Sequence, residues 1–240
     1  MSNGTETKAK SVSGLSEFVQ LKSGGWLRYL LEEIFATFLD WIPGPLGHLK
    51  RWFCYRLLIK GSGWIAIERG AKIFGTRWIE LGKGVYIGEG AMLQGRPGGL
   101  KIGDGVRIMP QAVLNVYNFR GLPGSGIELG KGCVIGIHAV ITGQGNVKIG
   151  EDVIIAPGVK ILPVNHNYSE PGSVIKDQGI NAQGIVIKKG AWLGAGSILL
   201  DGVEIGENAV VAAGAVVTES VAAGAVVAGN PAQLLKKSKT

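Results

Sequence analysis

The sequence predicts an all-β solenoid, a parallel β-helix with a short helical N-terminal lead. Glycine makes up 40 of the 240 residues, far above the usual content of about 7%, yet no Gly-X-Y triplet period is present, which excludes collagen. Aliphatic residues recur every six residues through most of the chain. A hydrophobic content of 46% is enough to bury a sizeable core, so a mainly disordered chain is also excluded.

The six-residue repeat begins near Leu81, and its anchor is an aliphatic residue that often precedes glycine. With breaks allowed between groups, 18 anchors are found, all of them Ile, Leu or Val: Leu81, Ile87, Leu93, Ile102, Ile108, Leu114, Leu129, Ile135, Ile141, Ile149, Ile155, Ile161, Ile187, Leu193, Leu199, Ile205, Val211 and Val217. Most anchors are followed four residues later by a small or β-branched residue, such as Val85, Ala91, Cys133, Ala191 or Ser197. The last six anchors follow one another without a break.

A six-residue unit with one large and one small inward residue fits a coil with three flat faces. Coils stacked about 4.8 Å apart bring the aliphatic residues into continuous ladders, and glycine serves the tight corners. A β-sandwich would show alternation of period two and turn residues every 8 to 12 residues, and neither is seen.

The chain divides into four parts. Residues 1–15 are expected to be a disordered tail, 16–62 an amphipathic helical lead, 63–230 the β-helix and 231–240 a C-terminal tail. One helix starts at Trp26 and carries apolar residues at intervals of three and four; Pro43 and Pro45 end it, and a second helix is expected from Leu46 to Ile59. The lead is interpreted as a cap on the β-helix, with membrane attachment or a wall of the substrate site as alternatives.

Charge and cysteine content narrow the class of protein. The net charge of +7 favours anionic partners, but the basic residues form no aromatic-interleaved patch, so no nucleic-acid partner is expected. The two cysteines have no metal-ligand spacing, and the polar N-terminus has no apolar signal segment. No apolar run approaches the roughly 18 residues of a membrane span. A cytoplasmic protein is therefore expected.

Breaks in the repeat are candidate functional sites, because insertions in a solenoid reach its surface. The longest break, 163–184, contains His166 among polar neighbours. Smaller breaks lie at 95–99, 115–126 and 144–146. A histidine is a suitable general base near neutral pH, since its ordinary pKa is about 6.5.

Three segments in order resemble the hexapeptide-repeat acyltransferases: IGEDVIIAPGVKI followed by an Asn-His pair, then GAWLGAGSILLDGVEIG, then GNPA. The resemblance covers about residues 80–236 and is nearest to the O-acetyltransferases of sugars and polysaccharides. It implies a left-handed β-helix, a homotrimer with sites between chains, acetyl-CoA as co-substrate, no metal cofactor, and a sugar or glycan acceptor.

The resemblance also implies roles for individual residues. His166 is the expected base, and the N–H of Ala195 faces the thioester. The expected coenzyme contacts are Trp192, Gly194, Ala213, Gly229, Pro231 and Lys236, the last with Lys237 and Lys239 or else part of a solvated tail. The expected acceptor contacts are Asn115, His138, Asn165 and Tyr168, with Arg120 meeting an acidic group.

Other functions stay open at this stage. An N-acetyltransferase of an amino sugar nucleotide would use the same histidine, and a non-enzymatic solenoid scaffold would need none. Serine acetylation is less favoured, because the helical lead is short. Zinc chemistry is disfavoured, since the three histidines lie 90 and 28 residues apart. Trp41, Trp52, Phe53 and Tyr55 beside Lys50, Arg51 and Arg56 favour a peripheral site on the inner membrane surface.

Overall fold

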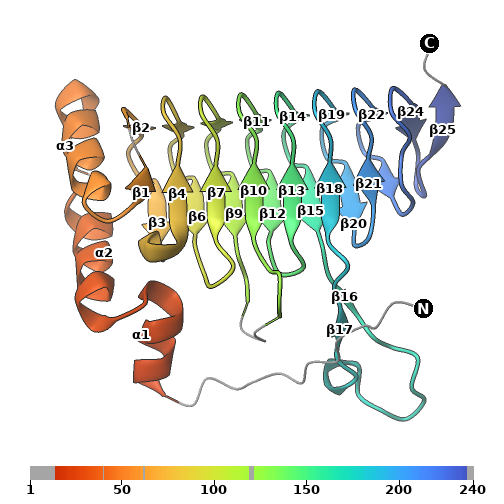
Figure 1. Ribbon diagram of the computed structural model, residues 1–240, viewed down its shortest axis with the longest axis horizontal. Coiled ribbons are helices and arrows are strands. Elements are labelled where there is room, and N and C mark those ends of the chain that lie inside the picture. Colours follow the sequence, from red (N-terminus) through yellow and green to blue (C-terminus); the bar gives the residue numbers. More distant parts are fainter. Residues whose placement is uncertain (1–13, 40, 62, 119–121, 237–240) are drawn as a thin grey trace.

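The computed structural model describes residues 14–39, 41–61, 63–118 and 122–236, and it is a left-handed parallel β-helix with a helical cap (Figure 1). The prediction of the fold class is confirmed. Each coil contributes one short strand to each of three sheets, which we call A, B and C in chain order.

Sheet A contains β1 (Lys60–Gly61), β4 (Ile79–Leu81), β7 (Leu100–Ile102), β10 (Ile127–Leu129), β13 (Val147–Ile149), β18 (Ile185–Ile187) and β21 (Glu204–Ile205). Sheet B contains β2 (Ala66–Ile67), β5 (Tyr86–Ile87), β8 (Arg107–Ile108), β11 (Val134–Ile135), β14 (Ile154–Ile155), β19 (Trp192–Leu193), β22 (Val210–Val211), β24 (Val226–Ala228) and β25 (Gln233–Lys236). Sheet C contains β3 (Lys72–Phe74), β6 (Met92–Gln94), β9 (Val113–Asn115), β12 (Val140–Thr142), β15 (Lys160–Leu162), β20 (Ile198–Leu200) and β23 (Val216–Val217).

The interior of the coils is the ladder of aliphatic residues that the repeat predicts. All 18 anchors are at most 4% exposed. In sheet B the parallel register places Ile108, Ile135, Ile155 and Leu193 directly above one another. Fully burying one such side chain stabilises the fold by about 1.5–3 kcal/mol, so the stack is the main source of stability.

The breaks in the repeat all lie at one corner of the coils. The segments 95–99, 115–126, 144–146 and 163–184 each connect a strand of sheet C to the next strand of sheet A. Figure 1 shows these connections leaving the coils on the same side. We call this corner the C–A edge. The long connections between coils are therefore concentrated at this edge.

Three helices cover the N-terminal end of the coils: α1 (Leu15–Ser23), α2 (Trp26–Phe38) and α3 (Gly44–Arg56). Helix α2 contacts β3 and α3 contacts β2, while α1 packs on α2 (Figure 1). The two helices expected in the lead are present, but α1 was not expected, and it starts inside the segment assigned to a tail. Residues 1–13 of that tail lie outside the described residues.

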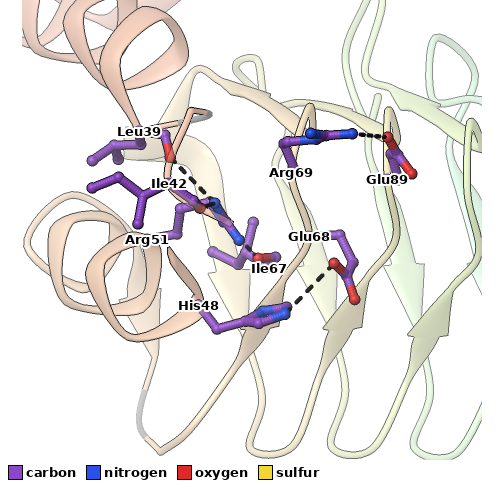
Figure 2. A network of polar contacts seen from close by, with 8 residues as sticks. All are labelled: Leu39, Ile42, His48, Arg51, Ile67, Glu68, Arg69 and Glu89. Atoms are coloured by element: carbon purple, nitrogen blue, oxygen red, sulfur yellow. Dashed lines mark hydrogen bonds and ion pairs between the residues drawn. The ribbon is translucent and has the colours of Figure 1, made fainter. Parts of the chain in front are cut away.

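The inner surface of the cap carries two buried charged residues, which the amphipathic pattern of the helical lead does not predict. Glu32 is fully buried and accepts hydrogen bonds from Ser23 Oγ (2.6 Å), Gly75 N (3.1 Å), Thr76 N (2.8 Å) and Thr76 Oγ1 (2.7 Å). Arg51 is 2% exposed and donates to the carbonyl oxygens of Ile67 (2.7 Å), Leu39 and Ile42 (both 3.2 Å), as Figure 2 shows. Buried charges need such partners, because an unpaired one is strongly destabilising.

This burial corrects the predicted membrane-facing cluster. Arg51 and Tyr55, expected on the surface, are 2% and 1% exposed. The reason is that α3 turns the side that carries Arg51 and Tyr55 toward the first coil and α2. Tyr55 packs edge-on against Phe35 of α2 at a centroid distance of 5.9 Å.

The C-terminal segment also differs from expectation. Residues 233–236 form β25, which pairs antiparallel with β24, so this part of the predicted tail closes the last coil. Lys237 and Lys239 lie outside the described residues. None of the helices in the described ranges combines the length and apolar character needed to cross a membrane.

Candidate active site

The predicted site residues fall on two separate edges of the coils. Asn115, Asn165, His166 and Tyr168 lie at the C–A edge, where the long connections leave. The other predicted residues follow the corner between sheets B and C, which we call the B–C edge: His138, Gly194, Ala195, Ala213, Gly229 and Pro231. Trp192 is on the outer face of sheet B beside this edge.

His166 lies on a two-stranded arm that extends from the C–A edge. Strand β16 (Asn165–His166) pairs antiparallel with β17 (Ile180–Asn181), and Figure 1 shows the pair projecting beyond the coils. Both residues of β16 are exposed, whereas Ile180 opposite His166 is buried. The arm therefore holds the imidazole on a hydrogen-bonded backbone and presents it to solvent.

Buried polar side chains shape the arm at its tip and at its base. Near the tip, the Gln178 side chain accepts from Glu170 N (3.0 Å) and donates to Glu170 O and Ser173 O. At the base, the Asp201 carboxylate accepts from the backbone N–H groups of Gln183 and Gly184 at 2.8–3.0 Å. Neither residue was singled out from the sequence, because their partners are backbone groups with no sequence signature.

Asn115 ends β9, two coils from the arm, or roughly 10 Å along the axis at the usual strand spacing. Its Oδ1 atom is buried and accepts no hydrogen bond from the described residues. Arg96, in the 95–99 connection at the same edge, is 4% exposed, and burial lowers the pKa of its guanidinium. Arg96 belongs to no motif in the sequence and was not predicted as a site residue. Arg120 lies outside the described residues.

The B–C edge is a regular row of turns joined by backbone hydrogen bonds. Gly158 N donates to Ile137 O (2.9 Å), Gly196 N to Pro157 O (2.9 Å) and Gly214 N to Ala195 O (2.8 Å). The turn after each sheet B strand thus lies directly beside the turn of the next coil. This row brings residues 18 or more apart in sequence into one line.

Glycine at position 194 permits the close stacking of this row. A Cβ atom there would lie 2.5 Å from Ala213 N, closer than any real contact. Ala195 and Ala213 are exposed, and within the described part of the chain their N–H groups donate no hydrogen bond. The edge therefore offers free backbone donors and little side-chain bulk, as a ligand lying along it would need.

His138 occupies a corner of the same edge. It is exposed with φ of 57°, the left-handed region, and its N–H donates to Pro110 O at 3.3 Å. His138 lies before β12, whereas His166 follows β15. The two histidines therefore lie at opposite ends of the sheet C strands, on the two different edges. They do not form a pair within one chain.

The C-terminal end of the edge is formed by Gly229 and Pro231, both exposed, with a cis peptide bond before Pro231. Lys236 is the last residue of β25 and pairs with Val226 through the backbone. These residues extend the row of turns beyond Ala213.

The two edges are separated by the width of sheet C. A strand of three residues spans about 10 Å, so His166 and the Ala195 N–H of one chain are too far apart to act on the same atoms. His166 and the row of free donors therefore lie on different edges, and the histidine on the B–C edge is His138.

A groove that holds none of the predicted site residues lies elsewhere. It has a volume of about 900 Å³ and follows the outer face of sheet A, where Glu80, Lys101, Glu128 and Lys148 alternate. Lys101 Nζ lies 3.4 Å from Glu128 Oε1. No predicted site residue lines this groove, and its charges have opposite-sign neighbours along the ladder, so we place the candidate chemistry at the edges.

No cluster of three or more His, Cys, Asp or Glu side chains that could hold a metal ion occurs among the residues described. His48 belongs to the cap, where its Nε2 lies 3.6 Å from Glu68 Oε2 (Figure 2). The three histidines occupy the cap, the B–C edge and the arm, three separate places in the fold.

Comparison with known proteins identifies the repeat. Residues 184–219 match the family described as bacterial transferase hexapeptide, six repeats. Over these residues the chain is similar to the repeat of this transferase family. The matched residues run from the base of the arm through Ala195 and Ala213, so they include the central part of the B–C edge.

Curated relatives match parts of this chain. A Schizosaccharomyces pombe protein with the provisional name serine acetyltransferase is 41% identical over 108 residues, 45% of this chain and 38% of its own length. A Saccharomyces cerevisiae protein provisionally named an acetyltransferase is 35% identical over 115 residues, 48% of this chain and 57% of its own length. The chain thus spans about half the length of the curated relatives it matches.

Solved structures share the fold at low sequence identity. An N-acyltransferase from Bacillus cereus, in complex with dTDP and 3-hydroxybutyryl-CoA, has a TM-score of 0.55 and 18% identity, covering 77% of this chain and 86% of that one. A hexapeptide-repeat acetyltransferase from Vibrio cholerae has a TM-score of 0.51 and 18% identity, covering 94% and 100%. These likenesses extend the shared fold to most of the described chain.

Proposed function

We propose that the protein is an acetyl-CoA-dependent O-acetyltransferase that acetylates a sugar hydroxyl in polysaccharide or glycolipid biosynthesis. The observation that carries the proposal is the placement of His166, exposed on a hydrogen-bonded arm, on a solenoid whose B–C edge presents free backbone N–H groups. The names of the curated relatives support acetyl transfer as the reaction.

His166 is the proposed general base. Acetyl transfer to an alcohol needs a group that takes the hydroxyl proton as oxygen attacks the thioester carbonyl, and such a base contributes about 10²–10⁴ in rate. The N–H of Ala195 would stabilise the oxyanion that forms on the former carbonyl oxygen when the carbon becomes tetrahedral. Collapse of that intermediate breaks the C–S bond, and the proton that His166 took from the hydroxyl passes to the leaving thiolate. The arm supplies the base and the edge supplies the oxyanion donor.

The coenzyme is proposed to lie along the B–C edge. Small residues at Gly194, Ala195 and Ala213 leave room for an extended pantetheine arm, and Gly229 with Pro231 continues the row toward the end of the coils. Trp192, 51% exposed, borders the edge. Lys236, at the end of β25, is proposed to meet a coenzyme phosphate.

The acceptor is proposed to bind at the C–A edge. The exposed side chains of Asn165 and Tyr168 offer polar groups to sugar hydroxyls. The Asn115 Oδ1 atom accepts no hydrogen bond among the described residues and is proposed to accept one from a sugar hydroxyl. His138 of a neighbouring chain is the proposed contact from the opposite side.

The separation of the two edges within one chain supports a site shared by two chains, as in a trimer. The outer face of sheet B is suited to such packing, because Val134, Ile154, Trp192 and Val210 form an apolar ladder there. The outer face of sheet A is charged instead. Subunit packing through sheet B would bring the B–C edge of one chain toward a neighbour. Light scattering that finds only a 25 kDa particle would contradict this assembly.

The test is acetyl-CoA consumption with a panel of sugars, amino sugar nucleotides and serine. We expect turnover on a sugar hydroxyl and a loss of about 10²–10⁴ in kcat for His166→Ala, because the base acts in the chemical step. Lys176→Ala, elsewhere on the arm, is the matched control and should keep wild-type rates. Turnover on serine alone, or on an amino sugar nucleotide alone, would overturn O-acetylation of a sugar. Activity above about a tenth in His166→Ala would assign the base to another group.

The location of the protein in the cytoplasm stays a prediction. Cys54 and Cys133 are both free thiols, which is compatible with it.

A further inference from the structure

The outer surface of the cap is unusually apolar. Of the 21 large hydrophobic residues that are exposed in the described chain, ten lie within residues 26–57. We call these ten the apolar cap face: Trp26, Leu27, Leu30, Ile34, Phe38, Trp41, Leu46, Leu49, Phe53 and Leu57. Exposed fractions reach 74% at Leu27 and 77% at Trp41. Contiguous exposed apolar surface of this kind marks an interaction site.

Helical spacing places these residues on one side of each helix. In α3, Leu46, Leu49, Phe53 and Leu57 recur at intervals of three and four and occupy about a quarter of the circumference at 3.6 residues per turn. The exposed apolar residues of α2 occupy about a third of its circumference by the same count. Each helix therefore presents a continuous apolar stripe.

The opposite sides of the helices are fixed to the coils by the buried charges. Glu32 binds the backbone of Gly75 and Thr76, and Arg51 binds the carbonyl of Ile67. Figure 1 shows α2 and α3 at the N-terminal end of the solenoid. Because Glu32 and Arg51 face the coils, the stripes on the opposite sides of the helices face away from the solenoid. Rotating the helices to bury the apolar cap face would break the hydrogen bonds of Glu32 and Arg51.

The charges around the face are positive. Lys50 and Arg56 are exposed on the two flanks of the α3 stripe, and Lys60 follows it. Among the described acidic residues of 26–57, Glu32 is buried and Glu33 is half-buried and paired with Lys22. An apolar stripe with cations on its flanks matches the boundary between acyl chains and anionic headgroups.

We propose that the apolar cap face docks on the surface of an anionic lipid bilayer, with α2 and α3 lying in the plane of the interface. A second copy of the chain fits the face less well, because it would bring Lys50 and Arg56 against the same cations, and no fully exposed acidic residue lies among the described residues of 26–57. The docking does not depend on the proposed chemistry. If the chain is the proposed trimer with parallel axes, three cap faces lie at the same end and bind together.

The test is flotation of the full-length protein with vesicles of phosphatidylcholine alone and of phosphatidylcholine with phosphatidylglycerol. We expect flotation with the anionic vesicles, about tenfold less of it for the double variant Leu49→Gln/Phe53→Gln, and a loss of lipid preference for Lys50→Ala/Arg56→Ala. Val174→Gln/Ile175→Gln removes two exposed apolar residues from the arm instead and should float like the wild type.

Flotation that is absent in the wild type, or equal in wild type and Leu49→Gln/Phe53→Gln, would overturn the proposal. Light scattering separates the other occupant: a larger assembly of the wild type that Leu49→Gln/Phe53→Gln disrupts without lipid would make a second copy the partner of this face. Thermal unfolding of each variant checks that the fold is kept. Neither readout uses acetyl transfer, so failure here leaves the proposed enzyme untouched.

Discussion

The coils and the cap are built with opposite polarity. In the coils, aliphatic residues such as Ile135 are buried and charged residues such as Lys101 and Glu128 lie outside. In the cap, Glu32 and Arg51 are buried against the coil, and leucine, phenylalanine and tryptophan face solvent. The cap therefore joins the core through a few apolar residues, such as Leu39 and Tyr55, and places buried charges beside them.

The end of a solenoid explains the buried charges. Each inner coil satisfies its backbone groups by bonding to the coils on both sides, but the first coil has no neighbour on one side. Glu32 accepts from two backbone N–H groups beside β3, and Arg51 donates to a carbonyl of β2. The two side chains act as the missing coil, and their apolar neighbours are left on the outside.

Breaking the cap contact is expected to give the largest effect on stability. Arg51→Ala leaves the carbonyl groups of Leu39, Ile42 and Ile67 without their charged donor. We expect a loss of about 3–5 kcal/mol in the stability of cap docking, because each buried acceptor left unsatisfied costs about 1–3 kcal/mol. Trp52 and Trp64 report on it, since their rings lie 5.2 Å apart across the junction of α3 and the first coil. Urea unfolding followed by near-UV circular dichroism measures the change.

Lys50→Ala is the matched control, because Lys50 is the exposed neighbour of Arg51 in sequence. It should alter stability by less than about 0.5 kcal/mol. A loss below about 1 kcal/mol for Arg51→Ala would show that the buried guanidinium does not hold the cap.

The coil interior should respond as an ordinary packed core. Ile135→Ala removes a fully buried side chain from the middle of the sheet B ladder, and we expect a loss of about 2–5 kcal/mol from lost burial and the cavity left behind. Leu49→Ala removes a side chain of the same volume from the cap face, where half of it is already exposed. Its cost should be near zero, measured by the same urea midpoints. Equal losses would erase the contrast between the two regions.

The rates at which the two cysteines react compare how readily the cap and the coils open, and this effect is smaller. Burial raises the pKa of both thiols, so both should react slowly with iodoacetamide at pH 8, where less thiolate is present than for an ordinary cysteine. Cys54, half-buried in the cap, should still be modified in the native protein, whereas Cys133, fully buried in the coils, should react only on unfolding. Mass spectrometry of timed samples decides it. Modification of Cys133 before Cys54 would mean that the coils open more readily than the cap.

The sequence predicts the coils well because their physics is local and repeated. Every anchor from Leu81 to Val217 meets the same burial requirement, so the period is visible without a structure. Ile67 and Ile73 of the first coil fall within the predicted β-helix, 63–230, but precede the regular run of anchors. The polarity of the cap could not be predicted, because two of the partners of Glu32, the N–H groups of Gly75 and Thr76, are backbone groups more than 40 residues away.

The roles of the site residues stay predictions. The break at 163–184 singled out His166, whereas Ala195 and Ala213 were selected by the resemblance to the hexapeptide-repeat acyltransferases. Which edge each residue occupies depends on how strands are assigned to sheets A, B and C, and the repeat alone does not give that phase. The clamps of the arm at Gln178 and Asp201 had no signature either.

The central claim is that the base of one chain acts at the coenzyme edge of another, and mixing two inactive variants tests it most directly. His166→Ala lacks the base, and Ala195→Phe fills the coenzyme edge with a side chain at an exposed turn. Each should be inactive alone. After denaturation together and refolding at equal amounts, a shared site predicts recovery of about a quarter of wild-type acetyl transfer, since one junction in four pairs two intact halves. No recovery, from trimers that chromatography shows to be mixed, would contradict a site built by two chains.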